Sequence, residues 1–384
     1  MSTHPLPPSR IERLGMRFMR SFAHKAQARG ERVEQEDALH VLNPRERALL
    51  RTIERNAIAR AAAAGALSGL VCALPSMLLG HHAVGDMGQQ VSYWAAVGLV
   101  TVVASIAEIL FLYWDGLRAV HDLSRAAGLS ILDEGDADDV LGFLRSLTRA
   151  ALELPDPPEA LEGLSPLREA PKLVLVLSSL AYKAKVVLTG FIVKALIRRA
   201  LGRAATRAVL ELVAMPVTAL WDAVVCWMIV REARLRVMGP SAAIELTDLL
   251  LPSPEGLSDG ARDGVLRAVG ASVVRSRNLH PNHAALLRTL EGAVDRESAS
   301  LHIDDSQLFL QHLPTLSHQE QTLCLRVLAT ASIIDGRLAG AEQLLLAQAF
   351  AQCNRAYDGR AIERLRRAFV SGKTIPYATL EAIG

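Results

Sequence analysis

The chain has 384 residues, of which 51% are hydrophobic and 21% are charged, and its formal net charge is +2. This balance excludes a transporter built from many membrane spans, and the small net charge gives no overall field that would attract nucleic acid. Aromatic residues make up only 4% of the chain, whereas alanine, leucine and arginine are frequent, a bias that favours helices. We therefore expect an all-α, membrane-associated protein with apolar spans and substantial soluble parts.

The N-terminal region, residues 1–60, is basic. Residues 10–29 predict an amphipathic helix, because Ile11, Leu14 and Phe18 recur at helical spacing. The same segment carries the basic residues Arg10, Arg13, Arg17, Arg20, Lys25 and Arg29. A helix of this kind either lies on an anionic membrane surface or packs as an ordinary surface helix on its own domain. No apolar stretch of signal-peptide type precedes the first apolar run, so we expect no cleavable leader.

Two apolar runs follow and predict a transmembrane hairpin. Residues 61–80 contain no charge, and residues 91–114 contain a single one. Each run has the length of roughly 20 residues that a helix needs to cross the hydrocarbon core. Small residues in the first run, Gly65, Ser68 and Gly69, would let a second helix approach closely. The alternative is a buried hairpin inside a large soluble helical protein.

Charges around the hairpin predict its orientation. Arginines precede Ala61, and Arg118 and Arg125 follow the second run, whereas the connection 81–90 contains neither lysine nor arginine. Lysine and arginine near the ends of spans favour the cytoplasmic side. We therefore expect an inner (cytoplasmic) membrane protein with both termini in the cytoplasm. Glu108, the single charge of the second run, is by default a functional intramembrane acid, and snorkelling to the interface is the alternative.

A second apolar hairpin is predicted over residues 172–238, and it carries more charges. Its turn is rich in arginine, and the positive-inside rule opposes placing that turn outside. We therefore expect a buried or membrane-peripheral hairpin rather than two further spans. In an antiparallel arrangement Lys194 would lie opposite Glu211, and Lys183 would lie opposite Asp222. We predict two structural ion pairs at these positions, because charges in apolar surroundings need partners.

The C-terminal part, residues 258–384, predicts a soluble helical domain. Residues 239–257 are interrupted by glycine and proline and predict a linker, and so do the acidic and proline-rich residues 133–171. The hairpin of the first two apolar runs then occupies residues 61–132. Helices in the C-terminal part are expected near 258–276, 281–297, 304–313, 317–335, 338–353 and 358–371. Four of them carry start signals: Pro281, Asp304, Ser317 and Asp358.

Residues 322–350 resemble the core of the TerB-like family of tellurite-resistance and stress-related helical domains. The likeness consists of an apolar helix, an Asp-Gly turn at Asp335 and Gly336, and a following helix with an early acid, Glu342. The resemblance implies an acidic metal-binding surface, with Asp335 and Glu342 as candidate ligands of a divalent cation. The family tends to repeat the Asp-Gly element in an earlier helical pair, and residues 275–287 depart from that pattern. Turn formation and helix capping explain both acids equally well.

No nucleotide-binding loop, zincin signature or nucleophile elbow occurs in the sequence, so we expect no enzyme and no cofactor other than that cation. Arginine-rich runs lack interleaved aromatic residues, so we expect no nucleic-acid partner. The cysteines form no CxxC pair and are expected to be reduced, buried thiols: Cys72, Cys226, Cys324 and Cys353.

These features favour a non-enzymatic inner-membrane protein that tethers a TerB-like helical module to the cytoplasmic face. Its partners would be the lipid membrane and further copies of the chain, and a stress or envelope role is implied by the resemblance alone. Two alternatives stay open. In an oligomeric permeation protein for ions or small molecules, Glu108 and the charged residues of the second hairpin would line a wet cavity. In a soluble helical protein with conditional membrane insertion, the apolar segments would bury one another.

Overall fold

The computed structural model describes residues 8–28, 44–79, 86–127, 137–152, 154, 164–166, 168, 207–298, 302–373, 375 and 377–383. This part of the chain contains helices and no strand, which confirms the all-α prediction for it. The α-helices are α1 (Arg10–Ala28), α2 (Pro44–Leu79), α3 (Met87–Ala126), α4 (Ala137–Ala151), α7 (Arg207–Leu250), α8 (Asp259–Ser276), α9 (Pro281–Val294), α10 (Ser306–His312), α11 (His318–Ala331), α12 (Gly340–Gln352), α13 (Gly359–Val370) and α14 (Tyr377–Glu381). Short 3-10 helices lie at η3 (Pro254–Gly256) and η5 (Leu313–Thr315).

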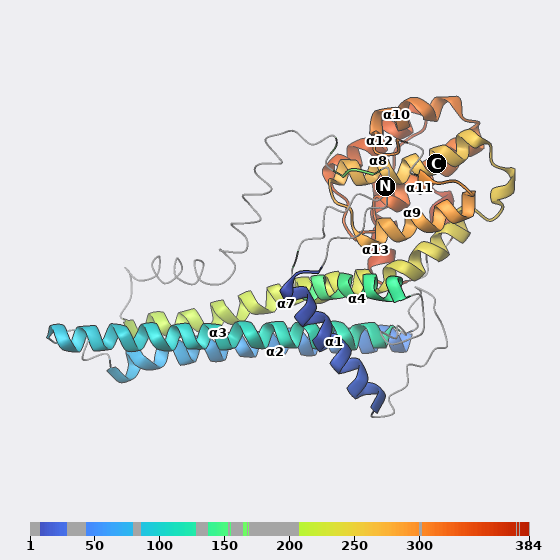
Figure 1. Ribbon diagram of the computed structural model, residues 1–384. Helices are drawn as coiled ribbons and strands as arrows, with labels where there is room; N and C mark the ends of the chain where they lie inside the picture. Colours follow the sequence, from blue (N-terminus) through green and yellow to red (C-terminus); the bar gives the residue numbers. More distant parts are fainter. Residues whose placement is uncertain are drawn as a thin grey trace.

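Helices α2, α3 and α7 run side by side as a long bundle (Figure 1). α2 and α3 are antiparallel, because Arg60 meets Asp115 whereas Ser68, which comes later in α2, meets Glu108, which comes earlier in α3. The described part of the first predicted apolar run, residues 61–79, lies within α2, and the second run lies within α3. Both helices are long and apolar enough to cross a membrane.

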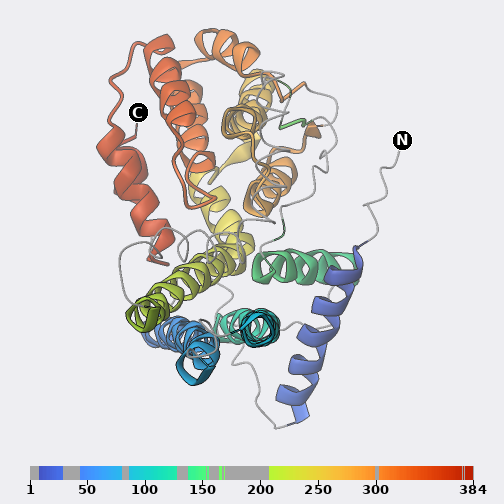
Figure 2. The same ribbon diagram turned by 90° about the vertical axis from the view of Figure 1, so that its left-hand side faces the viewer.

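Helices α1 and α4 lie across the bundle. Figure 2, in which α2 and α3 are seen nearly end-on, shows α1 and α4 from the side. The predicted amphipathic helix is confirmed as α1, whose buried face includes Met16 and Met19 and contacts α3 and α4. Glu12 on the same face forms ion pairs with Arg149 and, at 3.4 Å, with Arg145 of α4. The N-terminal helix is therefore fastened to the bundle by both apolar and charged contacts.

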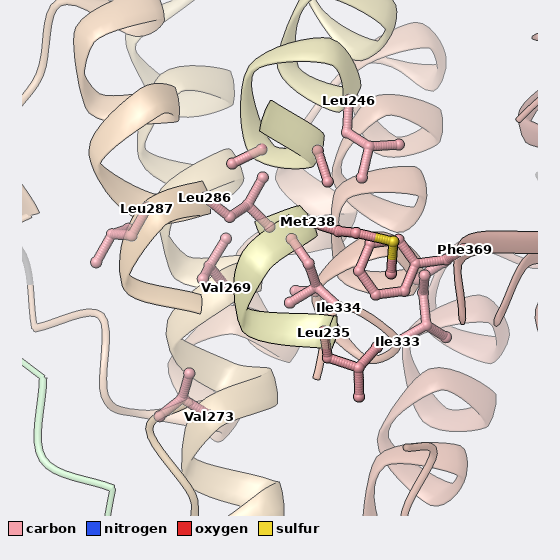
Figure 3. Close-up of a cluster of buried hydrophobic side chains, with 14 of the residues drawn as sticks. Leu235, Met238, Leu246, Val269, Val273, Leu286, Leu287, Ile333, Ile334 and Phe369 are labelled. Atoms are coloured by element: carbon pink, nitrogen blue, oxygen red, sulfur yellow. The ribbon is translucent and has the colours of Figure 1, made fainter. Parts of the chain in front are cut away.

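Helix α7 belongs to two parts of the molecule. Its first half packs against α2 and α3, and its second half enters the C-terminal helical domain (Figure 1). Figure 3 shows Leu235, Met238 and Leu246 of α7 within one buried cluster, together with Leu286 of α9 and Phe369 of α13. The last turns of α7 therefore form part of the core of the C-terminal domain.

The predicted linker over residues 239–257 is wrong for most of its length, because α7 continues to Leu250. A proline inside a helix removes a backbone hydrogen bond and costs about 3 kcal/mol, so Gly239 and Pro240 read as a break in the sequence. Burial of the residues that follow, such as Leu246, offsets that cost. Only the few residues between α7 and α8 connect the two helices.

The predicted linker over residues 133–171 is also wrong in part, because it contains α4. The buried side chains Leu144 and Leu147 anchor this helix against its neighbours. The acidic and proline-rich residues on either side of α4 dominate the composition of this segment, so its short apolar face is not recognised in the sequence. The first arm of the predicted second hairpin, residues 172–206, lies outside the described residues.

Local capping signals place the C-terminal helices well. α9 begins at Pro281, α11 follows the N-cap Ser317, and α13 follows the N-cap Asp358, as predicted. The fourth signal is displaced by one residue, since Asp305 rather than Asp304 accepts the capping hydrogen bonds of α10. Such caps act within one turn of the chain, which is why the sequence alone locates them.

Candidate functional site

The bundle presents many large apolar side chains to its outside. Those we call the apolar belt are Leu67, Leu70, Leu74, Met77 and Leu78 of α2, Val91, Trp94, Leu99, Val102, Val103, Ile106, Ile109, Leu110, Phe111, Tyr113 and Trp114 of α3, and Leu220, Trp221, Val224, Trp227 and Met228 of α7. Soluble monomers rarely expose contiguous apolar patches larger than a few hundred Å². The belt therefore marks a surface made to contact an apolar phase or partner.

Small residues bring α2 and α7 into close contact. A Cβ atom added to Gly65 would lie 2.7 Å from the backbone oxygen of Thr218, and one added to Gly69 would lie 3.0 Å from Cα of Met215. The Thr218 hydroxyl also donates a hydrogen bond of 2.8 Å to the backbone oxygen of Gly65. The predicted close approach of a second helix at these glycines is confirmed, and the approaching helix is α7.

Polar side chains meet inside the bundle, between α2 and α3. Glu108 is buried and its Oε2 accepts a hydrogen bond of 2.5 Å from the Ser68 hydroxyl. Nearer the cytoplasmic end expected from the sequence, Arg60 Nε lies 2.7 Å from Asp115 Oδ1. Glu108 therefore points toward α2, and its carboxylate is held there rather than at the end of the apolar run.

The two ion pairs predicted for the second hairpin stay predictions. Lys183, Lys194 and the side chain of Glu211 lie outside the described residues. Asp222 is buried on α7, and its carboxylate faces Gly65 of α2. The predicted acid thus lies in the interior of the bundle, at the level of the first apolar run.

The Asp-Gly turn of the C-terminal domain is fixed by contacts on both of its sides. Asp335 Oδ1 accepts a hydrogen bond of 2.8 Å from the backbone N–H of Arg337. Gly336 has φ +74°, a left-handed conformation that favours glycine. Its carbonyl oxygen accepts hydrogen bonds from Arg231 of α7 (3.2 Å) and Arg366 of α13 (2.9 Å). The turn therefore connects the C-terminal domain to the helix that enters the bundle.

Glu342, the second candidate metal ligand, is fully buried. Its Oε1 accepts a hydrogen bond of 2.9 Å from the Ser272 hydroxyl, and its Oε2 accepts one of 3.0 Å from Ala339 N–H. Burial, reinforced by the charge of Asp335, raises the pKa of this carboxyl to about 8. Within the described ranges no group of three His, Cys, Asp or Glu side chains converges as a metal site would require. Cation binding at Asp335 and Glu342 stays a prediction.

A buried polar junction connects α7 with α9 and α4. Glu232 Oε1 accepts hydrogen bonds from His280 Nε2 (2.9 Å) and Arg236 Nε (3.0 Å). Nδ1 of His280 accepts a hydrogen bond from the backbone N–H of Asn282, so Nε2 carries the proton that His280 donates to Glu232. Burial alone raises the pKa of Glu232, but His280 and Arg236 outweigh it and lower that pKa to about 2. Arg236 also donates to the backbone oxygen of Ser146 in α4 at 3.0 Å. Sequence reasoning did not identify this junction.

Asn282 is the residue of this junction whose replacement is expected to affect stability most clearly. Its side-chain amide is buried and donates to the backbone oxygens of Leu235 (3.0 Å) and Ile334 (2.8 Å). Asn282→Ala is expected to lower the free energy of unfolding by about 1–3 kcal/mol, because two buried carbonyl groups lose their donor. Denaturant unfolding of the purified chain measures this loss. The control is Asn278→Ala, at a half-buried position; an equal loss in both variants would contradict the assignment.

Comparison with known proteins gives no further guide: the chain matches no protein-family model, and no curated protein or solved structure is significantly similar to it. The TerB-like resemblance of residues 322–350 therefore stays a prediction. The apolar belt and the continuity of α7 are the features of this structure that bear on function.

Proposed function

We propose that this chain is a non-enzymatic inner-membrane protein that holds a TerB-like helical module at the cytoplasmic face. Helices α2 and α3 cross the membrane as a hairpin, and the first half of α7 packs against them. The second half of α7 carries the module. The apolar belt is the observation that supports this proposal. One continuous helix, α7, joins the belt to a C-terminal domain that has a buried core.

The belt favours a membrane over a soluble fold with conditional insertion. In a soluble fold the apolar helices would cover one another. Instead, the exposed fraction is 67% for Leu99 and 54% for Ile106 of α3, and it is 67% for Leu220 of α7. Burying such side chains contributes about 25 cal/mol per Å² of apolar surface, so contact with lipid would stabilise this arrangement.

The continuity of α7 supports a tether that holds its module in a set orientation. Leu235 and Met238 are buried in the C-terminal domain, and Thr218, on the same helix, contacts α2. A helix transmits both position and rotation, whereas a flexible linker transmits neither. The stress or envelope role of the module is proposed from the TerB-like resemblance alone.

Topology mapping with engineered cysteines tests the proposal. The native cysteines are buried, so they should react little. Met87→Cys, at the exposed start of α3, should react with a membrane-impermeant maleimide on sealed right-side-out vesicles. Leu344→Cys, exposed on the C-terminal domain, should react only after the vesicles are opened. The chain should also stay in the membrane pellet after an alkaline carbonate wash.

Two outcomes would contradict the proposal. Release of the chain by carbonate would exclude integral spans. Labelling of Leu344→Cys in sealed vesicles would place the module on the outer face.

A further inference from the structure

Helix α1 has a surface on which every exposed charge is positive. Its one acid, Glu12, is buried, and Arg145 and Arg149 of α4 hold it there. The basic stripe, as we call the exposed basic side chains of α1, consists of Arg10, Arg13, Arg17, Arg20 and Lys25. Among the residues that the structure describes, none of these side chains forms an ion pair. Within the described ranges, the positive charge of this surface is therefore not neutralised by an acid of the chain.

An exposed apolar stripe runs along α1 beside the basic stripe. Its members are Ile11, Leu14 and Phe18, with exposed fractions of 59%, 55% and 41%. These residues lie three and four positions apart, so they share one side of the helix. A helix packed only as part of a soluble domain would turn such a stripe inward, whereas α1 buries a different face.

Aromatic contacts join the apolar stripe to the apolar belt. Ring centroids of Phe18 and Phe22 are 6.5 Å apart, those of Phe22 and Trp114 are 6.4 Å apart, and those of Trp114 and Phe111 are 6.1 Å apart. The guanidinium group of Arg118 lies 5.7 Å from the Trp114 ring. Tryptophan next to arginine at the end of an apolar run is typical of the membrane–water interface. The stripe therefore meets the belt at the level where lipid headgroups begin.

The orientation of α1 is consistent with a position at the membrane surface. α1 lies across the bundle axis, so it runs along the membrane surface when α2 and α3 cross the bilayer (Figure 2). Basic amphipathic helices in this position bury their apolar side at the boundary of headgroups and acyl chains. On α1 the basic and apolar stripes are neighbours, which allows both contacts at once.

A shallow depression of about 470 Å³ lies on the basic side of α1. It is lined by Arg17, Arg20, Ser21, His24, Lys25 and Ala28. Guanidinium groups recognise phosphate through paired, charge-assisted hydrogen bonds. Several cationic donors around one open depression suit a phosphate group that arrives from the membrane surface.

We propose that α1 binds the headgroups of anionic phospholipids at the cytoplasmic face. The basic stripe contacts the phosphates, and the apolar stripe enters the acyl boundary. This inference rests on the proposed function, because it takes the apolar belt as embedded in the bilayer. Nucleic acid would use the basic stripe alone and would leave the apolar stripe in water, so lipid accounts for both.

The test compares lipid preferences of the full chain in bilayer nanodiscs. Spin-labelled phosphatidylglycerol and phosphatidylcholine report how strongly each lipid associates with the protein. The wild-type chain should prefer phosphatidylglycerol by roughly fivefold at low ionic strength, and salt should weaken this preference. The variant Arg13→Glu/Arg17→Glu/Arg20→Glu should lose the preference.

The matched control is a triple variant with the same change in charge at exposed arginines of the C-terminal domain, Arg277→Glu/Arg288→Glu/Arg360→Glu. This control should keep the wild-type preference. If the α1 variant fails to fold, Arg13→Gln/Arg17→Gln/Arg20→Gln removes the charge without reversing it and should weaken the preference in the same direction.

Equal lipid preferences in the wild type and in a folded α1 variant would overturn the proposal. Salt-sensitive binding of an oligonucleotide through the same arginines, without any lipid preference, would assign the surface to nucleic acid and also overturn it. The carbonate wash tests the spans separately. If carbonate releases the chain, co-sedimentation with phosphatidylglycerol vesicles still measures whether α1 binds anionic lipid.

Discussion

Gly65→Leu is expected to lower the free energy of unfolding by about 3 kcal/mol, because it forces α7 away from α2. The new side chain would start 2.7 Å from the oxygen and 2.9 Å from the carbon of the Thr218 carbonyl group, with the carboxylate of Asp222 also in contact. Backbone atoms of a packed helix cannot move aside as the end of a flexible side chain can. Thermal unfolding of the purified chain in detergent, followed by circular dichroism, measures the loss.

The matched control for this variant is Gly98→Leu on α3. A Cβ atom at Gly98 would meet nothing within 4 Å, and the residue is exposed on the belt. The substitution also removes a glycine from a helix interior, which favours folding by a few tenths of a kcal/mol up to about 1 kcal/mol. Gly98→Leu should therefore be neutral or slightly stabilising. Similar losses in both variants would argue against the close contact of α2 with α7.

The C-terminal domain is expected to lose stability as the pH rises from 4.5 to about 8, and Glu342→Gln is expected to remove that loss. Burial raises the pKa of Glu342 from 4.5 to about 8 in the folded chain. Between these values the unfolded carboxyl has released its proton while the folded one still holds it, so rising pH favours unfolding. The total effect is on the order of a few kcal/mol. Glutamine keeps the size of the side chain; its oxygen can accept from Ala339 N–H, and its NH2 group can donate to the Ser272 hydroxyl.

Urea unfolding over a series of pH values gives the difference in free energy of unfolding between the wild type and Glu342→Gln. Burial lowers the pKa of His283 to about 4, so this residue makes stability rise with pH between 4 and 6.5 in both proteins. Taking the difference cancels that contribution. The control is Glu320→Gln, because hydrogen bonds from Ser258 and Ser317 lower the pKa of Glu320 to about 2. The free energy of unfolding of Glu320→Gln should therefore differ from that of the wild type by a constant amount above pH 5. A constant difference for Glu342→Gln as well would contradict the prediction.

Features that depend only on neighbouring residues follow from the amino-acid sequence alone. Apolar runs predicted α2 and α3, and the spacing of Ile11, Leu14 and Phe18 predicted α1. Side-chain caps such as Ser317 and Asp358 located helix starts to the residue. Periodicity and capping act within one or two turns, so these predictions need no knowledge of the rest of the fold.

The surface that each helix packs against depends on contacts between distant parts of the chain. The continuation of α7 through Gly239 and Pro240 depends on apolar contacts with helices that follow much later in the chain. The same holds for the second arm of the predicted hairpin, which lies beside α2 instead of forming a separate unit in the described residues. A local pattern shows which side of a helix is apolar, but not which surface covers it. The sequence therefore could not show that α7 unites the bundle with the module.

Burial of the polar residues was likewise a tertiary outcome. Glu342 was predicted as an early helix acid and a candidate ligand, and the fold turns it into a buried cap bonded to Ser272, 70 positions earlier. Pro281 predicts a helix start, and its two neighbours His280 and Asn282 connect α9 with α7. Their free-energy contributions arise from desolvation and from partners distant in sequence, and both of these exist only once the helices have packed.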